Sequence, residues 1–195
     1  MDTPYINKGK ELVVLSSGNL TKSISNVKQD LPKYWDNEYL EERISLIKNY
    51  QHKMLLQFLR MSGVRITEAI TLRKKDIDFN SYMMNIRWLK SRKYHNRNVP
   101  LHPTLKATLE GYTATMKEDD RVFPITRQRA WQIVNKYLDG SPHQLRHSFA
   151  VHWLRSGGEI TTLSRVLGHS DINTTMIYLR IVPIDQAKEL FKIKF

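Results

Sequence analysis

The chain of 195 residues contains no cysteine and no long hydrophobic run. Without cysteine it can form neither disulfide bonds nor metal sites built from thiolates. None of its apolar stretches approaches the roughly 20 residues that cross a bilayer, and residues 1–10 lack the apolar segment of a signal peptide. The sequence therefore predicts a cytoplasmic protein without a membrane partner.

Acidic residues are scarce compared with basic ones, since 19 aspartates and glutamates face 31 lysines and arginines and leave a net charge of +12. Such an excess favours a polyanionic partner such as nucleic acid, although ribosomal, membrane-surface and heparin-binding proteins share it. The length fits one domain, or one domain with a short appendage, and suffices for a real hydrophobic core.

Hydrophobic periodicity predicts helices along most of the chain. Gly63 and Gly168 are placed to end two of them, while Thr126 and Ser141-Pro142 are placed to begin two others. One more short helix is predicted near the end of the folded part. The predicted helical segments are residues 39–50, 52–61, 67–72, 105–112, 127–138, 142–156 and a shorter one that ends at 167.

One stretch instead has a two-residue period, which predicts a half-buried strand with four residues on one face: Tyr82, Met84, Ile86 and Trp88. Residues 76–79 and 98–101 are predicted as its neighbours. The fold class is therefore mainly α with a small three-stranded antiparallel sheet. Residues 90–97 are predicted as a hairpin tip with four cationic side chains: Lys90, Arg92, Lys93 and Arg97.

Three segments are predicted along the chain: an arm or linker over residues 1–31, one folded domain over 32–182, and a tail helix over 183–195. The arm lacks sustained periodicity. The tail places four apolar residues on one helical face, so it either folds onto its own core or docks on a neighbour: Ile184, Ala187, Leu190 and Phe191.

The most informative motif is the run Pro142-His143-Gln144-Leu145-Arg146-His147, which is followed by Leu167-Gly168-His169 and then by Tyr178. Far upstream, Arg65 lies in Ser62-Gly63-Val64-Arg65-Ile66-Thr67-Glu68. This ordered set over residues 32–182 resembles the catalytic domain of tyrosine recombinases, the phage integrase and Xer-like family. The segment Thr126-Arg127-Gln128-Arg129 is similar to the family's preceding helix.

Phosphodiester transfer without a metal requires fixed cations around the phosphorus. Arg65 and Arg146 suit this role because a guanidinium donates two parallel hydrogen bonds and stays charged. Tyr178 would attack the phosphorus, and a phenol with a pKa of about 10 needs help to lose its proton. His143 lies on the same helical face as Arg146 and is the predicted acceptor, whereas His169 would hydrogen-bond a phosphate oxygen.

The departing 5′-oxygen needs a proton, and a lysine on a mobile hairpin is a suitable general acid. Lys90 is predicted for this role. The hairpin is about two residues longer than in Xer-type members, so Lys93 remains a rival. Glu68 is predicted to orient Arg65 or to contact the helix dipole, and His147 to support the site indirectly.

The resemblance implies a 3′-phosphotyrosine intermediate, no metal or cofactor, double-stranded DNA as the partner, and a homotetramer on DNA that exchanges tails between protomers. The family's N-terminal core-binding domain has no counterpart here, which leaves a short natural member and a catalytic fragment as alternatives. Five basic residues are predicted phosphate contacts, with ordinary surface charge as the alternative: Arg92, Lys93, Arg97, Arg127 and Arg129.

Other readings are weaker. His143 and His147 have the spacing of a zinc pair, but no glutamate lies beside His143 and Arg146 would repel a metal. A type IB topoisomerase uses nearly the same chemistry, but His143 and the missing topoisomerase clamp favour recombination. A non-catalytic DNA-binding regulator is disfavoured by the intact set of candidate residues, and an unrelated basic DNA-binding protein would form no covalent adduct. The expected location is the nucleoid.

Overall fold

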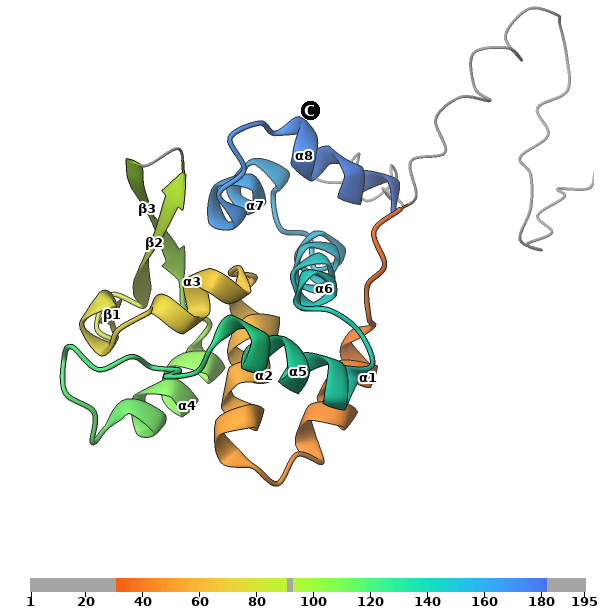
Figure 1. Ribbon diagram of the computed structural model, residues 1–195. Coiled ribbons are helices and arrows are strands. Elements are labelled where there is room, and N and C mark those ends of the chain that lie inside the picture. The colour runs from red at the N-terminus through yellow and green to blue at the C-terminus, as the bar shows by residue number, and fades with distance from the viewer. Residues whose placement is uncertain (1–30, 91–92, 182–195) are drawn as a thin grey trace, which may run out of the picture. The chain divides into compact units, whose positions relative to one another are not determined.

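The computed structural model describes residues 31–90 and 93–181, with residues 89, 90, 93 and 94 described by their backbone alone. Most elements are helices, and the one small sheet lies at one side of them, which confirms the predicted fold class (Figure 1). In this part of the chain no helix is long and apolar enough to cross a membrane. The elements in order are α1 Asn37–Ser45, α2 Tyr50–Ser62, α3 Ile66–Thr71, η1 Lys74–Asp76, β1 Ile77–Asp78, β2 Met83–Lys90, β3 Lys93–Pro100, α4 Pro103–Thr113, α5 Arg127–Leu138, α6 Pro142–Arg155, α7 Ile160–Leu167, α8 Asn173–Met176 and η2 Ile177–Arg180.

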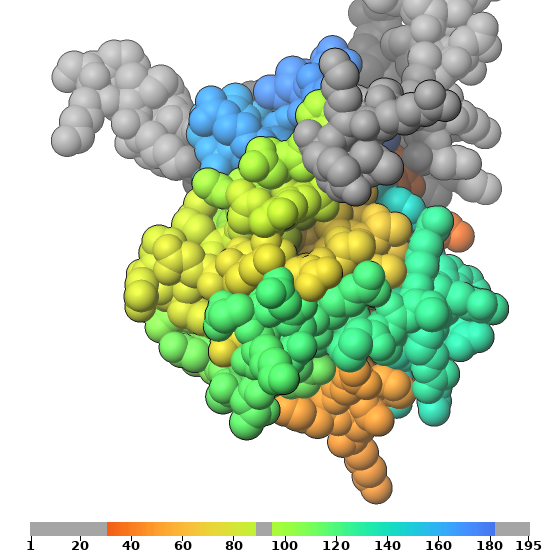
Figure 2. Space-filling view, turned by 60° about the vertical axis from the view of Figure 1, so that its left-hand side comes forward, coloured from red at the N-terminus to blue at the C-terminus, as the bar shows by residue number. Residues whose placement is uncertain are grey.

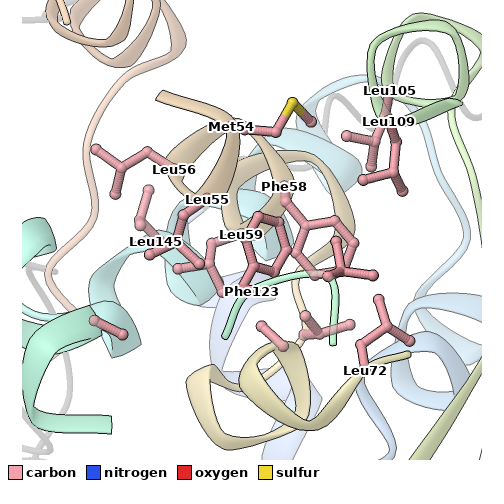
Figure 3. Close-up of a cluster of buried hydrophobic side chains, with 14 of the residues drawn as sticks. Met54, Leu55, Leu56, Phe58, Leu59, Leu72, Leu105, Leu109, Phe123 and Leu145 are labelled. Atoms are coloured by element: carbon pink, nitrogen blue, oxygen red, sulfur yellow. The ribbon is translucent and has the colours of Figure 1, made fainter. Parts of the chain in front are cut away.

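The main hydrophobic core is centred on α2. Phe58 of α2 is fully buried, and its ring lies 5.2 Å from that of Phe123, measured between centroids. Figure 3 shows Leu145 of α6 and Leu109 of α4 packed around the same helix. Burying each such side chain contributes about 1.5–3 kcal/mol. The core therefore fixes α6, which carries the run from His143 to His147, against α2.

Polar caps set the helix boundaries. The first predicted helix ends at Ser45 rather than at residue 50, because the Asn49 side chain accepts a hydrogen bond from the His52 N–H at 2.9 Å and begins α2 there. Gly63 ends α2 with φ 63°, as predicted. Thr126 caps α5 and Gly168 ends α7 with φ 67°, which confirms those boundaries as well.

The sheet has the order β1-β2-β3 with antiparallel pairing. Met84 and Ile86 of β2 are buried as predicted. The hairpin tip is shorter than predicted, because β3 already starts at residue 93 and only residues 91 and 92 separate the strands. Cross-strand contacts explain the extension: the ring of Trp88 stacks on that of His95 with centroids 5.5 Å apart.

A second, smaller core joins the end of the described chain to α6. It contains Ala150 and Val151 of α6, Leu163 and Leu167 of α7, and Tyr178 of η2. As a result α6 lies between α2 and the pair α7 and α8 (Figure 1). The ends of α2 and α7, which lie next to the other two motifs, are thereby brought to α6.

Candidate active site

Arg146 is the most deeply buried cation of the site, with 5% of its surface exposed. Its Nη1 donates to the carbonyl of Gly63 at 2.8 Å, and its Nη2 donates to the carbonyl of Leu167. These bonds tie α6 to the ends of α2 and α7. Burial, followed by the charge of Arg65, lowers the pKa of Arg146 to about 9, so the side chain stays protonated at neutral pH.

Arg65 emerges where α2 has ended and α3 begins. Its Nη1 lies 3.1 Å from a carboxylate oxygen of Glu68 and 3.5 Å from the carbonyl oxygen of Leu167. About a third of the side chain, 34%, remains exposed. Arg65 and Arg146 therefore meet at one carbonyl, with Arg65 on the accessible side.

Glu68 binds two arginines from a buried position. Its side chain is 1% exposed and accepts two bonds from Arg97, at 2.9 and 2.8 Å, in addition to the contacts with Arg65. Burial opposes ionisation of Glu68, but the hydrogen bond and charge of Arg97, with smaller contributions from Arg65, outweigh it and lower the carboxyl pKa. Glu68 therefore makes the contacts with Arg65 that the predicted orienting role requires.

Arg97 does not lie in the hairpin tip, where the sequence predicts it. It belongs to β3 rather than to a loop, and its side chain is 8% exposed. Besides Glu68, it donates from Nε to the carbonyl of Val166 at 2.8 Å and lies 5.0 Å from the ring centroid of Trp88. Its register explains this, because Val99 is buried and Arg97 is on the same face of the strand. Its guanidinium is therefore occupied inside the protein.

The carbonyl end of α7 is the common point of the three arginines. Val166 accepts from Arg97, while Leu167 accepts from Arg146 and Arg65. The last carbonyls of a helix have no partner within it and carry a partial negative charge. They therefore suit cations that would otherwise repel one another. No sequence motif indicates these main-chain acceptors.

His169 follows α7 and faces the same cluster. Its Nδ1 lies 2.7 Å from Oγ1 of Thr175, a residue that is fully buried. Burial, followed by the charges of Arg146 and Arg65, lowers the pKa of His169 to about 4, so the ring is neutral at neutral pH. The sequence does not indicate Thr175, because only the fold distinguishes it from the adjacent Thr174.

Tyr178 is 3% exposed, and its hydroxyl lies 2.8 Å from Nδ1 of His147. Burial raises the pKa of the phenol, although the charge of Arg146 acts in the opposite direction. The predicted acceptor, His143, lies exposed in the first turn of α6. Burial, then Arg146 and Arg65, lower the pKa of His143.

A groove of about 1400 Å³ extends from Arg65 and His169 over α3 and one face of the sheet. Figure 2 shows the side of the molecule with the yellow-green strands, next to the blue segment that contains α7. Asp119 pairs with Lys75, and Asp76 pairs with Arg87. Five basic side chains beyond the cluster line the groove: Arg73, Lys75, Arg87, Arg121 and Arg165.

The other predicted contacts are spread over the surface. Arg127 and Arg129 are exposed in the first turn of α5. Lys90 and Lys93 face each other as backbone partners at the end of the hairpin, and Arg92 lies outside the described residues. Within residues 31–90 and 93–181, no three histidine, aspartate or glutamate side chains are grouped so that they could hold a metal ion.

The sequence model of the phage integrase family matches residues 37–183. The chain is 30% identical over 170 residues to tyrosine recombinase XerA of Pyrococcus horikoshii, an alignment that covers 80% of this chain and 59% of that protein. It is 32% identical over 173 residues to tyrosine recombinase XerA of Thermococcus onnurineus, with 80% and 60% covered. The chain thus spans less than two thirds of these relatives.

Solved structures share the fold. The crystal structure of XerA recombinase superposes with a TM-score of 0.67 at 22% identity, over 85% of this chain and 67% of that one. The catalytic domain of bacteriophage HP1 integrase superposes with a TM-score of 0.65 at 23% identity, over 82% and 94%. XerH bound to its difH substrate in a post-cleavage complex superposes with a TM-score of 0.62 at 21% identity, over 88% and 58%.

Proposed function

The chain belongs to the phage integrase family, and on this basis we propose that it is a site-specific DNA recombinase acting through a 3′-phosphotyrosine intermediate. Residues 32–182 form the catalytic domain in this proposal, in line with the matched range of 37–183. The observation that carries it is the convergence of Arg65, Arg146, His169 and Tyr178, which lie on four different segments. Arg65 and Arg146 both bond to the Leu167 carbonyl. The charge of Arg146 acts on the pKa of His169 and on that of Tyr178.

In the proposed reaction, the hydroxyl oxygen of Tyr178 attacks the scissile phosphorus and gives up its proton to His143, the acceptor that the sequence predicts. A bond forms between this oxygen and phosphorus while the bond from phosphorus to the 5′-oxygen breaks. Lys90, or its rival Lys93, gives the departing 5′-oxygen a proton. The energy of the broken bond is retained in the phosphotyrosine, and a 5′-hydroxyl of the partner strand reverses the step to join the strands.

Arg65 and Arg146 stabilise the charge that develops on the non-bridging oxygens. Each guanidinium has five N–H donors, and the two Nη atoms of Arg146 each use one on a carbonyl. The remaining donors are held in place before DNA arrives, which makes their stabilisation of a transition state effective. His169, neutral and held at Nδ1, has Nε2 available for a phosphate oxygen.

Double-stranded DNA is the proposed substrate and partner. XerH in a complex with difH, and the Tn1549 transposon integrase in a complex with a circular intermediate DNA, are structural neighbours bound to DNA. We place phosphate contacts at exposed Arg127 and Arg129 and at the hairpin residues Arg92 and Lys93, with Arg97 retained inside the fold. A homotetramer on DNA at the nucleoid completes the proposal; the tail over residues 183–195 lies outside the described residues.

The experiment first selects a binding site from random-sequence duplex DNA. A nicked suicide substrate with that site is then incubated with the protein, and the protein–DNA adduct is located by denaturing gel and peptide mapping. We expect an adduct at Tyr178 that Tyr178→Phe abolishes. Binding without an adduct would refute catalysis. Strand exchange between two sites, as opposed to relaxation of supercoils, separates recombination from type IB topoisomerase activity.

A further inference from the structure

The hydrogen bond between Tyr178 and His147 gives the nucleophile a partner that the proposed reaction has not used. The hydroxyl oxygen lies 2.8 Å from Nδ1, and the two rings have centroids 5.8 Å apart with an interplanar angle of 51°. His147 directly follows Arg146 on α6. The same turn of helix therefore holds one phosphate-binding cation and the partner of the nucleophile.

Burial makes this partner necessary. Tyr178 packs in the second core with Val151, Leu163 and Leu167, and only 3% of its surface is exposed. A buried hydroxyl without a partner is costly. Among the described residues, the hydrogen bond to His147 is the one that the hydroxyl makes.

We propose that His147 is a positioning residue for Tyr178, whose neutral Nδ1 accepts the phenolic O–H and fixes the direction of the attacking oxygen before DNA binds. The inference rests on the proposed function, because Tyr178 is the nucleophile there. In this arrangement the ring proton of His147 resides on Nε2. Removal of the phenolic proton during attack is a separate step, which the proposed reaction assigns to His143, and His147 stays neutral.

The charges around His147 support an uncharged acceptor. On its own helix it faces His143 and Arg146, and the segment packed against it contributes the phenol of Tyr178. Burial, followed by His143 and Arg146, lowers the pKa of His147 to about 4. A neutral ring has one nitrogen with a free lone pair, whereas an imidazolium has none.

Two substitutions separate the hydrogen bond from packing. His147→Asn replaces Nδ1 by an amide group that retains an acceptor but loses the ring. His147→Phe keeps the ring but loses the acceptor. If His147 positions the hydroxyl, the asparagine variant resembles the wild type; if the ring merely fills space, the phenylalanine variant does. His152→Asn, on the same helix, serves as a control for changes to α6.

The first measurement needs no activity. 3-Fluorotyrosine is placed at position 178 of the full chain, and its 19F resonance is titrated with pH in the absence of DNA. A hydrogen bond donated by the neutral phenol disfavours ionisation, so His147→Phe should shift the resonance and lower the phenol pKa. His147→Asn and His152→Asn should leave both unchanged. An unchanged pKa in His147→Phe overturns the proposal.

The second measurement is single-turnover cleavage of the suicide substrate. Misplacing a reacting group by about 1 Å can cost about 100-fold in rate, so His147→Phe should cleave about 100-fold more slowly while its Kd for DNA is unchanged. His147→Asn should stay within about tenfold. A wild-type rate in His147→Phe overturns the inference, as would full loss in His147→Asn. If His147→Phe does not fold, His147→Met tests the same loss of acceptor.

A substrate with a 5′-bridging sulfur separates the nucleophile from the leaving group, because a thiolate departs without a general acid. The alanine variant of whichever lysine is the general acid, Lys90 or Lys93, should regain cleavage on this substrate, whereas His147→Phe should remain slow. Recovery of His147→Phe would place His147 on the leaving-group side and overturn the inference. If the wild type forms no adduct at all, the proposed function fails, and the 19F titration still decides the role of His147.

Discussion

Removing the charge of Glu68 is the sharpest test of how the arginine cluster is held together. The carboxylate is 1% exposed and accepts two bonds from Arg97, one from the Arg65 side chain and one from the Arg65 backbone N–H. Glu68→Gln keeps the shape but places an NH₂ group opposite N–H donors. It also leaves Arg65, Arg97 and Arg146 without the carboxylate between them.

Breaking a buried ion pair by neutralising one partner typically costs about 3–5 kcal/mol. For a chain of this size, each kcal/mol lowers Tm by about 2–4 °C, so Glu68→Gln should melt about 6–20 °C below the wild type. The matched control is Glu118→Gln. Glu118 pairs with Lys74 at 3.2 Å but its side chain is 67% exposed, so its loss should cost no more than about 1 kcal/mol.

Urea and thermal unfolding, followed by far-UV circular dichroism, measure both variants. The pH dependence has a definite sign. The pKa of Glu68 is lowered in the folded state, so its contribution is complete above the unfolded pKa of about 4.3 and is lost as the pH falls through the folded value. The gap between wild type and Glu68→Gln should shrink in acid. A gap below about 1 kcal/mol at pH 7 would refute the reasoning.

Three further predictions follow from other contacts. Gly63→Ala should lower the free energy of unfolding by about 1–2 kcal/mol through its positive φ. It should lower it further because the new methyl group clashes with an aromatic ring of α6. Gly157 also has a positive φ but lies in open space, so Gly157→Ala should show the backbone effect alone. Equal losses in urea unfolding would contradict this. Thr175→Val should slow single-turnover cleavage by up to about tenfold, because His169 loses the hydroxyl that orients it and such a hydrogen bond is worth about 0.5–1.5 kcal/mol. Thr175→Ser should restore the rate, and a fast valine variant would argue against that role. Arg127→Ala should reduce the slope of log Kd against log salt concentration by about 1 without changing the stability of the protein. An unchanged slope would show that Arg127 does not contact a phosphate.

Local signals in the sequence were sufficient for most helix boundaries and for the order of the motifs. Gly63 and Gly168 have the positive φ that a helix-ending glycine accepts without strain, and Thr126 makes the expected capping bond. The break between the first two helices is predicted at residue 51 but lies over residues 46–49, because Asn49 caps α2 inside a stretch whose hydrophobic periodicity continues across it.

The contacts that organise the site depend on tertiary structure. The sequence pattern groups Arg97 with the exposed hairpin cations, because it predicts that the third strand starts at residue 98. Continuing the alternation back from Val99 places Arg97 on the inner face instead. No comparable signal indicates the Leu167 carbonyl, because every residue has the same main-chain carbonyl group. Nor does helical spacing determine that His147, rather than His143, meets Tyr178, because this depends on how η2 packs on α6.

The anchoring of three arginines at the carbonyl end of α7 also bears on how the protein is made. A ribosome releases the chain from its N-terminus, so Arg65, Arg97 and Arg146 emerge before Leu167. The bonds that join the three at α7 can form only once that helix has been synthesised. Tyr178 emerges later still. A nascent chain would therefore place the Tyr178 hydroxyl beside His147 last, when the rest of the described domain is already present.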